Sequence, residues 1–566
     1  MADETTPQPP VPTDAEAAPP AARPRRRAGY GLVTLALMGM HLLVRFGGMI
    51  QKIVLGHFFG TSNMGDVAAA VEKVFQSVYY IGEELLKGTF LPVFNSIRQG
   101  DDDGGADEQA AWGLASSVAG ILTFILVIIT ILGMTFTEGF CALILGRPEA
   151  ADANYAANLE QFHLTVRIVR LSFAGLFCTS LGSLTYGLLN AYKRFVSPAL
   201  GDLAQKAGII TGIVIMSVGF GSENPIGYAL GFILGGVFKL LTHLIALGSK
   251  LRMARPKIDW KSPRLKELGL LMLPLLAGSL VGKVRDFAEF RIAWEATQQV
   301  VGTAASLDFA RKTVNLPINV LPYAMGIALF PFLTDWALRG EKDKVTSAFL
   351  SASRNMIFIF APITALFLLM GPEIITVVFK QGQFDANSVS LVTAAFYVYG
   401  AACAFYALEI IANQVFYAHR DTRTPFFIGL FTSTLHIIIA YVGGLLLGLG
   451  NVGIAAGYAI SKAIKVVIQW YLLRPRLTGF DWPSLLRLFG AAAVASVGLA
   501  ATVYAGRLVF GQLGWDLGGR GQAAIFVVGV GGLAFAVFIA IAALLRVPEV
   551  DLVLAKVRNK LRRGRK

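Results

Sequence analysis

The feature that most constrains this chain is a succession of apolar segments, each long enough to cross a lipid bilayer. About 20 apolar residues span the hydrocarbon core as a helix, and from Tyr30 onward we count about fourteen such segments. Inside a bilayer every backbone N–H and C=O needs an internal partner, so these segments must be helices. The sequence therefore predicts an all-α polytopic membrane protein. The segments lie near residues 31–58, 67–97, 110–135, 163–190, 197–220, 226–249, 266–296, 306–336, 345–370, 388–417, 425–448, 452–473, 484–509 and 521–545.

The distribution of basic residues predicts how the chain is oriented. A hydrophobic fraction of 55% with only 15% charged residues excludes the soluble globular class. The net charge of +14 would suit nucleic acid, but the basic residues concentrate in alternate short loops and in the C-terminal tail. This is the positive-inside pattern of membrane proteins. It predicts a multi-pass protein of the bacterial cytoplasmic (inner) membrane with both termini cytoplasmic and no nucleic-acid partner.

The same pattern assigns individual loops and the two tails. Lys257 and Arg420 are expected on the cytoplasmic side, and Arg147 and Lys380 on the external side. Residues 1–29 are rich in Pro, Ala and charged residues without an apolar stripe, which predicts a disordered cytoplasmic tail. Residues 546–566 form a basic cytoplasmic tail.

Three short matches in consistent order indicate an internal duplication. Residues 191–198 parallel 418–425, residues 227–230 parallel 457–460, and residues 90–94 parallel 329–333. The duplication predicts two pseudo-symmetric six-helix lobes with the same membrane orientation and a substrate site between them. The lobes are expected at residues 30–250 and 265–475, followed by two extra transmembrane helices at residues 484–545.

The stretch Leu276–Glu295 carries charges although apolar sequence flanks it. On a helix, Lys283, Arg285, Asp286 and Glu289 share one arc. A charge in mid-membrane costs roughly 2.5 kcal/mol or more, so this arc must face protein or water. One interpretation is pairing within the helix, of Arg285 with Glu289 and of Lys283 with Asp286. The other, which we favour, is the wall of a polar transport cavity, where Asp286 is also a candidate for binding a coupling cation.

Further basic residues fall inside apolar segments. Arg45 lies about halfway along the first segment, and Lys52 follows about two helical turns later on the same face. Lys73 in the second segment and Lys312 in the eighth occupy matching positions of the repeat. These cations outnumber nearby acids such as Asp66, and a positive cavity between lobes favours an anionic substrate. Arginine and lysine there suit phosphate.

Other motifs point away from an enzyme. Gly448–Gly453 satisfies G-x-G-x-x-G but joins two apolar helices with no strand before it, so a dinucleotide site is not expected. The three cysteines are scattered and the six histidines show no paired metal spacing. No soluble stretch is long enough for an ATPase domain. We expect no cofactor and no covalent chemistry, and the sequence leaves any coupling ion unidentified.

Several runs of residues resemble the MurJ (MviN) family of lipid II flippases, over nearly all of residues 30–545. The resemblance implies a fold of the multidrug/oligosaccharidyl-lipid/polysaccharide exporter superfamily, with two lobes that work by alternating access. It also implies cationic cavity residues that face the pyrophosphate of the lipid-linked peptidoglycan precursor. The runs are Arg45–Lys52, His57–Gly60 with Asp66, Phe90–Phe94, Asn315–Pro331, Phe379–Phe384 and Phe416–Pro425.

The chain departs from the family pattern at charged positions. Gln51, Tyr79 and Tyr80 stand near positions where the family has arginines, and Asn315 replaces an acidic residue before a proline. The cluster of residues 283–289 is not part of the pattern. From the residues and the resemblance together, the candidate substrate-binding side chains are Arg45, Lys52, Asp66, Lys73, Lys283, Arg285, Asp286, Glu289 and Lys312.

The sequence thus favours a flippase for lipid II or a related polyprenyl-pyrophosphate saccharide, acting in peptidoglycan synthesis, cell-wall biogenesis and cell shape. Its expected partners are this anionic lipid-linked substrate and membrane lipids, with cell-wall synthesis proteins as candidates. One alternative is an exporter of another amphipathic or cationic solute. The other is a transport-incompetent membrane scaffold for envelope synthesis that docks partners through basic cytoplasmic loops.

Overall fold

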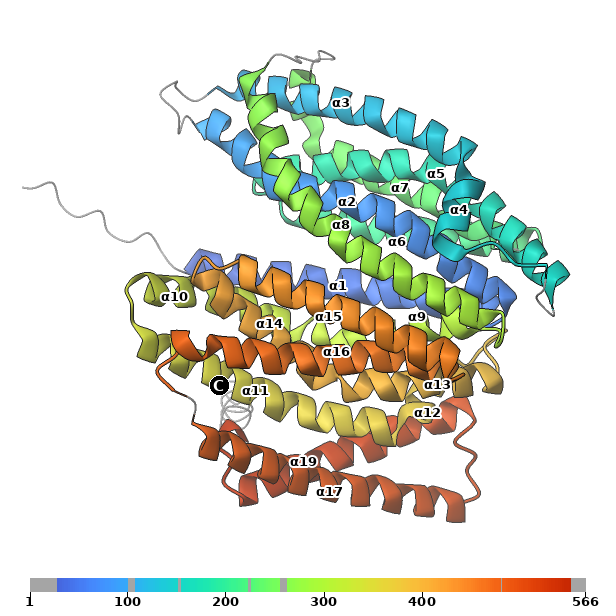
Figure 1. Cartoon of the computed structure of the whole chain (residues 1–566), viewed down its shortest axis with the longest axis vertical. Helices are drawn as coiled ribbons and strands as arrows, with labels where there is room; N and C mark the ends of the chain where they lie inside the picture. The colour runs from blue at the N-terminus through green and yellow to red at the C-terminus, as the bar shows by residue number, and fades with distance from the viewer. Residues whose placement is uncertain are drawn as a thin grey trace, which may run out of the picture.

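The computed structural model of the chain describes residues 28–99, 107–150, 154–221, 225–254, 262–479 and 481–550. Within these ranges the regular elements are helices and none is a strand, so the predicted all-α fold is confirmed. The long helices run roughly side by side in Figure 1. The predicted tails, residues 1–29 and 546–566, lie almost entirely outside the described residues, and so does Lys257.

The first group of helices corresponds to the predicted N-terminal lobe. Long apolar runs make these helices, and their exposed residues are largely apolar, as the hydrocarbon of a bilayer requires. The elements are α1 (Ala28–Phe59), α2 (Asn63–Gln99), α3 (Glu108–Thr135), α4 (Thr137–Leu145), α5 (Tyr155–Ala191), α6 (Val196–Val214), the π-helical η1 (Ile215–Gly219), α7 (Ile226–Leu247) and the 3-10 turn η2 (Gly248–Met253). The helices α2 to α7 lie in the upper part of Figure 1, and α1 lies below them.

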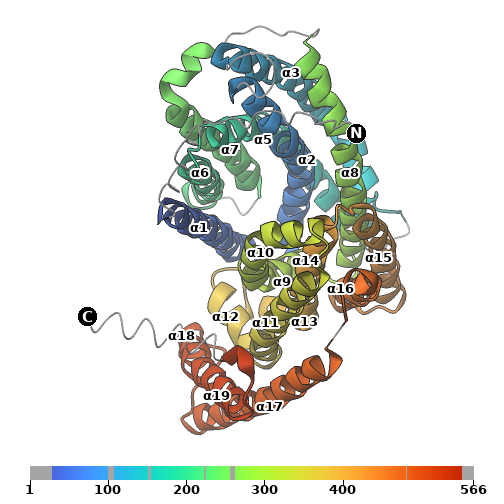
Figure 2. The ribbon, with the colours of Figure 1, turned by 90° about the vertical axis from the view of Figure 1, so that its left-hand side faces the viewer.

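The second group corresponds to the predicted C-terminal lobe. Its first helix, α8 (Pro263–Thr297), packs against α2 of the first group and against α9, α15 and α16 of its own. The remaining elements are α9 (Thr303–Ile318), α10 (Leu321–Leu338), α11 (Lys342–Leu369), α12 (Gly371–Phe379), α13 (Ala386–Ala401), α14 (Cys403–Ala418), α15 (Arg423–Tyr441), η3 (Val442–Leu446), α16 (Gly450–Leu473) and η4 (Arg474–Arg476). Figure 2, which looks along the helices, shows α8 at the side between the two groups.

The last helices form an appendage on the second group. They are α17 (Trp482–Gln512), α18 (Arg520–Ile525), η5 (Phe526–Val530) and α19 (Gly531–Leu544), and they pack against α11 and α12. Two ion pairs with buried carboxylates fix them: Arg507 with Glu373, at 2.7 Å, and Arg354 with Glu549. Figure 2 shows them at the lower end of the molecule.

The number of membrane spans depends on whether two helices that are rich in charged residues are counted as spans. In the described residues, 11 helices are long and apolar enough to cross a membrane, and 12 if the bent pair α13–α14, with its 42° angle, is one span. The two other predicted segments are α2 and α8, which are 37 and 35 residues long but rich in charge. The predicted count of about fourteen therefore stays a prediction. The two uncertain helices, α2 and α8, carry part of the candidate site.

Prolines shape the predicted eighth segment. The chain breaks into α9 and α10 at residues 319–320, and Pro322 follows in the first turn of α10, where a missing N–H is tolerated. Pro92, in contrast, lies inside a continuous α2. The eighth segment is thus broken into two helices, whereas the second remains one helix.

Local backbone features recur at the positions that the sequence repeat equates. Lys193 after α5 and Arg420 after α14 both adopt positive φ, 59° and 56°, which is uncommon for residues with a side chain. In each group the following helix, α6 or α15, ends in a π-helical turn, η1 or η3. These correspondences support the duplication, whose limits at residues 30–250 and 265–475 remain a prediction.

Glycines allow two pairs of helical elements to pack closely: α6 with α7, and η3 with α16. A Cβ at Gly208 of α6 would lie 2.5 Å from the Gly235 nitrogen of α7, and one at Gly212 would lie 2.4 Å from Gly231. In the second group, a Cβ at Gly453 of α16 would lie 2.2 Å from the Gly443 carbonyl carbon of η3. Small residues let membrane helices approach until their backbones touch.

Gly208→Leu is therefore expected to separate α6 from α7 and to lower the free energy of unfolding by ~1–3 kcal/mol, the usual cost of overpacking. The measurement is the thermal unfolding midpoint of the detergent-solubilised protein. Gly113→Leu on α3 is the matched control, because nothing lies within 4 Å of a Cβ there. Equal midpoints for both variants would contradict the close-packing account.

Candidate functional site: a charged network between the helix groups

Lys52 of α1 is the centre of a buried ion cluster that joins the two helix groups. Its ammonium contacts Glu72 of α2 and Asp308 of α9. Lys312, one turn after Asp308, lies 3.5 Å from Glu72, and the Tyr228 hydroxyl of α7 also donates to Glu72. We call Lys52, Glu72, Asp308 and Lys312 the Lys52 cluster. Its two cations and two carboxylates balance, which lowers the cost of charge at this depth.

A second ion cluster surrounds Glu289 of α8. Arg311 of α9 binds this carboxylate with both terminal nitrogens and donates to the Tyr399 hydroxyl at 2.7 Å. His436 of α15 lies 3.8 Å from Glu289. The Arg311 guanidinium also lies over the rings of Tyr399 and Tyr458, at 5.0 and 5.2 Å from their centroids. A bidentate pair of this kind is the strongest partner available to a buried carboxylate.

Lys73, Asp286 and Arg285 form the third contact, between α2 and α8. Asp286 accepts from Arg285 at 2.7 Å and lies 3.9 Å from Lys73. The alternative interpretation, pairing of Arg285 with Glu289 within the helix, is not observed: Glu289, which is 5% exposed, is bound by Arg311 across the helix interface. The Glu289 carboxylate is buried against α9. It therefore lies closer to Arg311 of that helix than to Arg285, which is one turn away on α8. Glu289 and Asp286 therefore contact cations of neighbouring helices, Arg311 and Lys73, whereas Arg285 pairs with Asp286 on α8 itself.

Asp66 has backbone partners rather than ionic ones. Its carboxylate accepts hydrogen bonds from the N–H groups of Gly302, at 2.6 Å, and Ala305, at 2.8 Å. These groups belong to the start of α9, whose own N-cap residue provides no side-chain cap. Asp66 therefore caps a helix of the opposite group, and a cap of this kind contributes about 1 kcal/mol. In this conformation its carboxylate is fully buried.

Three glycine-containing loops close the end of the molecule at which Asp66 caps α9. We call them the glycine seam; they are residues 60–62, 298–302 and 380–385. The Gln383 N–H donates to the His57 carbonyl at 2.8 Å, and the Thr61 hydroxyl donates to Ser388 at 2.9 Å. Gly60, Gly302 and Gly382 all have positive φ, and a Cβ on any of them would lie 2.2–2.4 Å from a facing carbonyl oxygen, that of Gln383, Thr61 or His57 respectively. Main-chain contacts thus join the two helix groups at this end.

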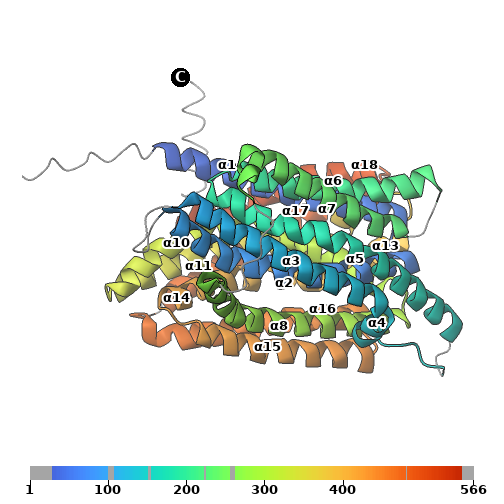
Figure 3. The same ribbon diagram turned by 90° about the horizontal axis from the view of Figure 1, so that it is seen from above.

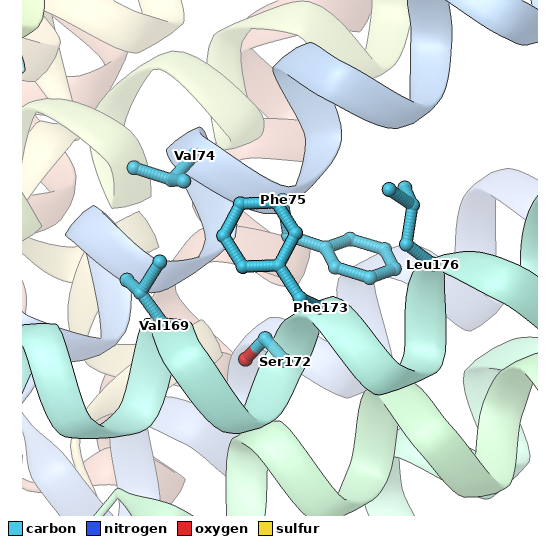
Figure 4. Close-up of a pocket in the computed structure, with 6 residues that line it drawn as sticks. All are labelled: Val74, Phe75, Val169, Ser172, Phe173 and Leu176. Atoms are coloured by element: carbon cyan, nitrogen blue, oxygen red, sulfur yellow. The ribbon is translucent and has the colours of Figure 1, made fainter. Parts of the chain in front are cut away.

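Arg45 and Lys283 are the two remaining predicted cations. Arg45 is exposed and stands two turns before Lys52 on the same face of α1. Lys283 is half-buried, one turn of α8 before Asp286. The small pocket in Figure 4 also lies elsewhere, because Val74, Phe75, Phe173 and three further side chains of α2 and α5 line it and none is charged. It has no part in the charged network.

The network therefore connects α1, α2, α8, α9 and α15, and Figure 3 shows α8 beside α15 and α16. Comparison with known proteins identifies the family of this chain. The family model described as lipid II flippase MurJ matches residues 55–519. The chain belongs to this family. The predicted resemblance is thereby confirmed.

Relatives and solved structures agree with the MurJ assignment. The chain is 25% identical over 478 residues to the probable lipid II flippase MurJ of Bdellovibrio bacteriovorus, covering 84% of this chain and 88% of the relative. It is 24% identical over 481 residues to the lipid II flippase MurJ of Burkholderia cenocepacia, covering 83% and 89%. The solved structure of a lipid II flippase MurJ in an inward closed conformation matches with a TM-score of 0.70 at 17% identity, covering 90% of this chain and 98% of that one. A MATE family transporter in an inward-facing conformation matches with a TM-score of 0.63 at 16% identity, covering 79% and 97%.

Within this MurJ family member, several titratable residues of the network were absent from the predicted set. A partial signal existed for three of them: Glu72 directly precedes Lys73, and Asp308 and Arg311 lie within about one turn of Lys312 in a predicted membrane segment. No local pattern pairs either one with Lys52. The missed residues with ion-pair partners in or beside the network are Glu72, Asp308, Arg311, His436, Glu409, Lys462 and Lys465.

Glu289→Gln is expected to destabilise the protein by about 3–5 kcal/mol, because it leaves Arg311 buried without a carboxylate. Adding Arg311→Met should recover most of the loss, since the unpaired charge is then removed. The thermal unfolding midpoint in detergent measures both effects.

Glu267→Gln on the same helix is the control, because Glu267 pairs with Arg264 at the surface, where removing a partner changes little. If the double variant were as unstable as Glu289→Gln alone, the Arg311 pairing would not explain the loss.

Proposed function

We propose that this member of the MurJ family moves lipid II, or a related polyprenyl-pyrophosphate saccharide, across the cytoplasmic membrane by alternating access. The observation that carries the proposal is the charged network between the two helix groups, beneath a closed glycine seam. Curated relatives bear the name lipid II flippase, which supports the same substrate for this chain. The proposed activity is transport without covalent chemistry.

The exposure of the network supports contact with substrate or water. Lys52 and Glu72 have side chains only 2% and 6% exposed, whereas Asp308 and Lys312 in the same cluster are 29% and 42% exposed. Charged groups that stay accessible between membrane helices cannot face lipid without a large cost. They are therefore suited to line an aqueous path. The accessible side of the network also includes Lys73 and Arg285, and we propose that Lys283 and Asp286 belong to it.

Arg45 is the side chain we propose for the substrate phosphate. It shares a face of α1 with Lys52, which points between the helix groups, and it is exposed rather than packed. A guanidinium offers two parallel donors to a phosphate, so its geometry as well as its charge contributes to binding. Lys52 and Lys312 lie deeper on the same side, held by carboxylates that a pyrophosphate would compete with.

Alternating access requires the glycine seam to open while the opposite end closes. The seam consists of a few hydrogen bonds, including the two that Asp66 accepts from the start of α9. A small number of contacts keeps the two conformations close in free energy, which a cycling transporter needs. We propose that Asp66 acts in this closure rather than by touching the substrate.

Complementation of a strain depleted of its lipid II flippase tests the proposal. The wild-type gene should restore growth and lipid II translocation. Arg45→Ala should abolish translocation at near-normal expression, and Arg45→Lys should retain part of it, because charge remains while the bidentate fork is lost. Wild-type expression in the membrane without rescue would favour export of another solute or a scaffold role.

The proposed orientation, with both termini cytoplasmic and the glycine seam external, is tested by single cysteines in a background without the native ones. A cysteine at Lys380 or Arg147 should react with a membrane-impermeant maleimide in intact cells. A cysteine at Arg420 or Lys193, in the loops after α14 and α5, should react only after the cells are permeabilised. The reverse pattern would invert the topology.

A further inference from the structure

A further buried ion cluster lies within the second helix group, apart from the Lys52 cluster. Glu409 of α14 is 5% exposed, and both of its oxygens are occupied by lysines of α16. Lys465 contacts one oxygen at 2.7 Å and Lys462 contacts the other. The two lysines are spaced i,i+3, so they share one face of α16. We call these three residues the Glu409 cluster.

Among the ion pairs that the described residues form here, positive and negative charges do not balance. Glu409 neutralises one of its two lysines, and Asp286, shared by Arg285 and Lys73, neutralises one of those two. The Arg311–Glu289 pair is neutral, as is the Lys52 cluster with two cations and two carboxylates. Among these ion pairs of the described residues, the surplus cations therefore belong to the sets around Asp286 and Glu409. An uncompensated cation at membrane depth is costly, and a bound anion would remove that cost.

Aromatic rings line the cluster but do not neutralise it. The Lys462 ammonium lies 4.4 Å from the ring centroid of Tyr406 and 5.5 Å from that of Tyr458. The Tyr406 hydroxyl bonds to that of Tyr323, which is 43% exposed, so this pair of tyrosines connects the cluster to an exposed side chain. The like charges of Arg285 and Lys462 repel each other.

The backbone of α15 leaves room beside the second lysine. Gly429 faces the Lys465 ammonium, and the only atom within 4 Å of a Cβ built at Gly429 is the Lys465 nitrogen, at 3.9 Å. The side chains of Lys462 and Lys465 are 14% and 16% exposed, so neither is sealed from its surroundings. A small anionic group can approach the lysines here without displacing a side chain of α15.

We propose that the Glu409 cluster is a second anion subsite, which takes a carboxylate or phosphate group of the transported amphiphile at a distance from the Lys52 cluster. Glu409 occupies the lysines until the anion arrives and competes with it. The proposal rests on the proposed function for its substrate, lipid II. That molecule carries a diphosphate next to the lipid and carboxylates at the end of its peptide, and we assign the subsite to the carboxylate end.

Equilibrium binding to the full chain in nanodiscs tests the subsite with two probes, lipid II and undecaprenyl diphosphate, which lacks the saccharide and peptide. Lys462→Gln and Lys465→Gln should each weaken lipid II binding by about tenfold or more, the worth of a charge-assisted hydrogen bond. Binding of undecaprenyl diphosphate should stay within about twofold. Weakening of both probes alike would still support the anion subsite but assign it to the diphosphate.

Two further variants separate an anion site from a structural cluster. Glu409→Gln frees both lysines and should tighten lipid II binding, whereas a purely structural role predicts no gain. Gly429→Leu keeps every charge but fills the space beside Lys465, and it should weaken lipid II binding as Lys465→Gln does. Lys344→Gln, at an exposed pair with Glu341, is the control for loss of a lysine. Lys465→Arg should preserve binding, which guards against misfolding as the cause.

The binding experiments distinguish failure of the subsite proposal from failure of the proposed function. If the wild type binds neither probe but retains lysine-dependent binding of phosphatidic acid over phosphatidylcholine, the lipid II assignment fails and the anion subsite stands. If the wild type binds lipid II while the lysine variants, Glu409→Gln and Gly429→Leu all bind it equally, the subsite is refuted and the proposed function stands.

Discussion

The cost of placing a charge in a membrane organises the interior of this protein. A lone cation at the bilayer centre is too expensive to keep, yet α1, α2, α8 and α9 all carry ionised residues within their helical spans. The structure resolves this by pairing charges between helices: Lys52 with Glu72 and Asp308, and Arg311 with Glu289. Each pair stabilises only while its two helices stay together, because breaking a buried pair leaves an uncompensated charge. The ion pairs thus fix which helices are neighbours.

The two ends of the interface between the helix groups are built differently. At the glycine seam the contacts are made by backbone atoms and short side chains, at van der Waals distance. Deeper in the molecule the contacts are between long charged side chains with partly exposed partners. A backbone contact tolerates little displacement, whereas a lysine or arginine can follow a moving carboxylate over a few ångströms. The backbone contacts are suited to closing one end fully, and the charged side chains are suited to rearranging around a bound substrate.

The helices could be predicted from the sequence because their signal is local. An apolar run of sufficient length has no alternative to a helix in a bilayer, and Pro322 marks the break between α9 and α10. The candidate residues were also visible, since any charge in such a run is conspicuous. Their partners were not, because Glu289 could pair with Arg285 on its own helix or with Arg311 across an interface, and only the packing of α8 on α9 decides. Asp66 illustrates the limit most clearly, because its partners are backbone N–H groups more than 200 residues away, which no side-chain pattern can reveal.

The cap that Asp66 provides to α9 has a consequence for the solvent. While the seam is closed, this carboxylate and the N–H groups of Gly302 and Ala305 satisfy one another without water. When the helix groups part at this end, the carboxylate and the first turn of α9 must both be hydrated instead. Opening therefore takes up water, and the balance between the two conformations depends on water activity. Osmolytes that are excluded from protein surfaces favour the dry, closed seam.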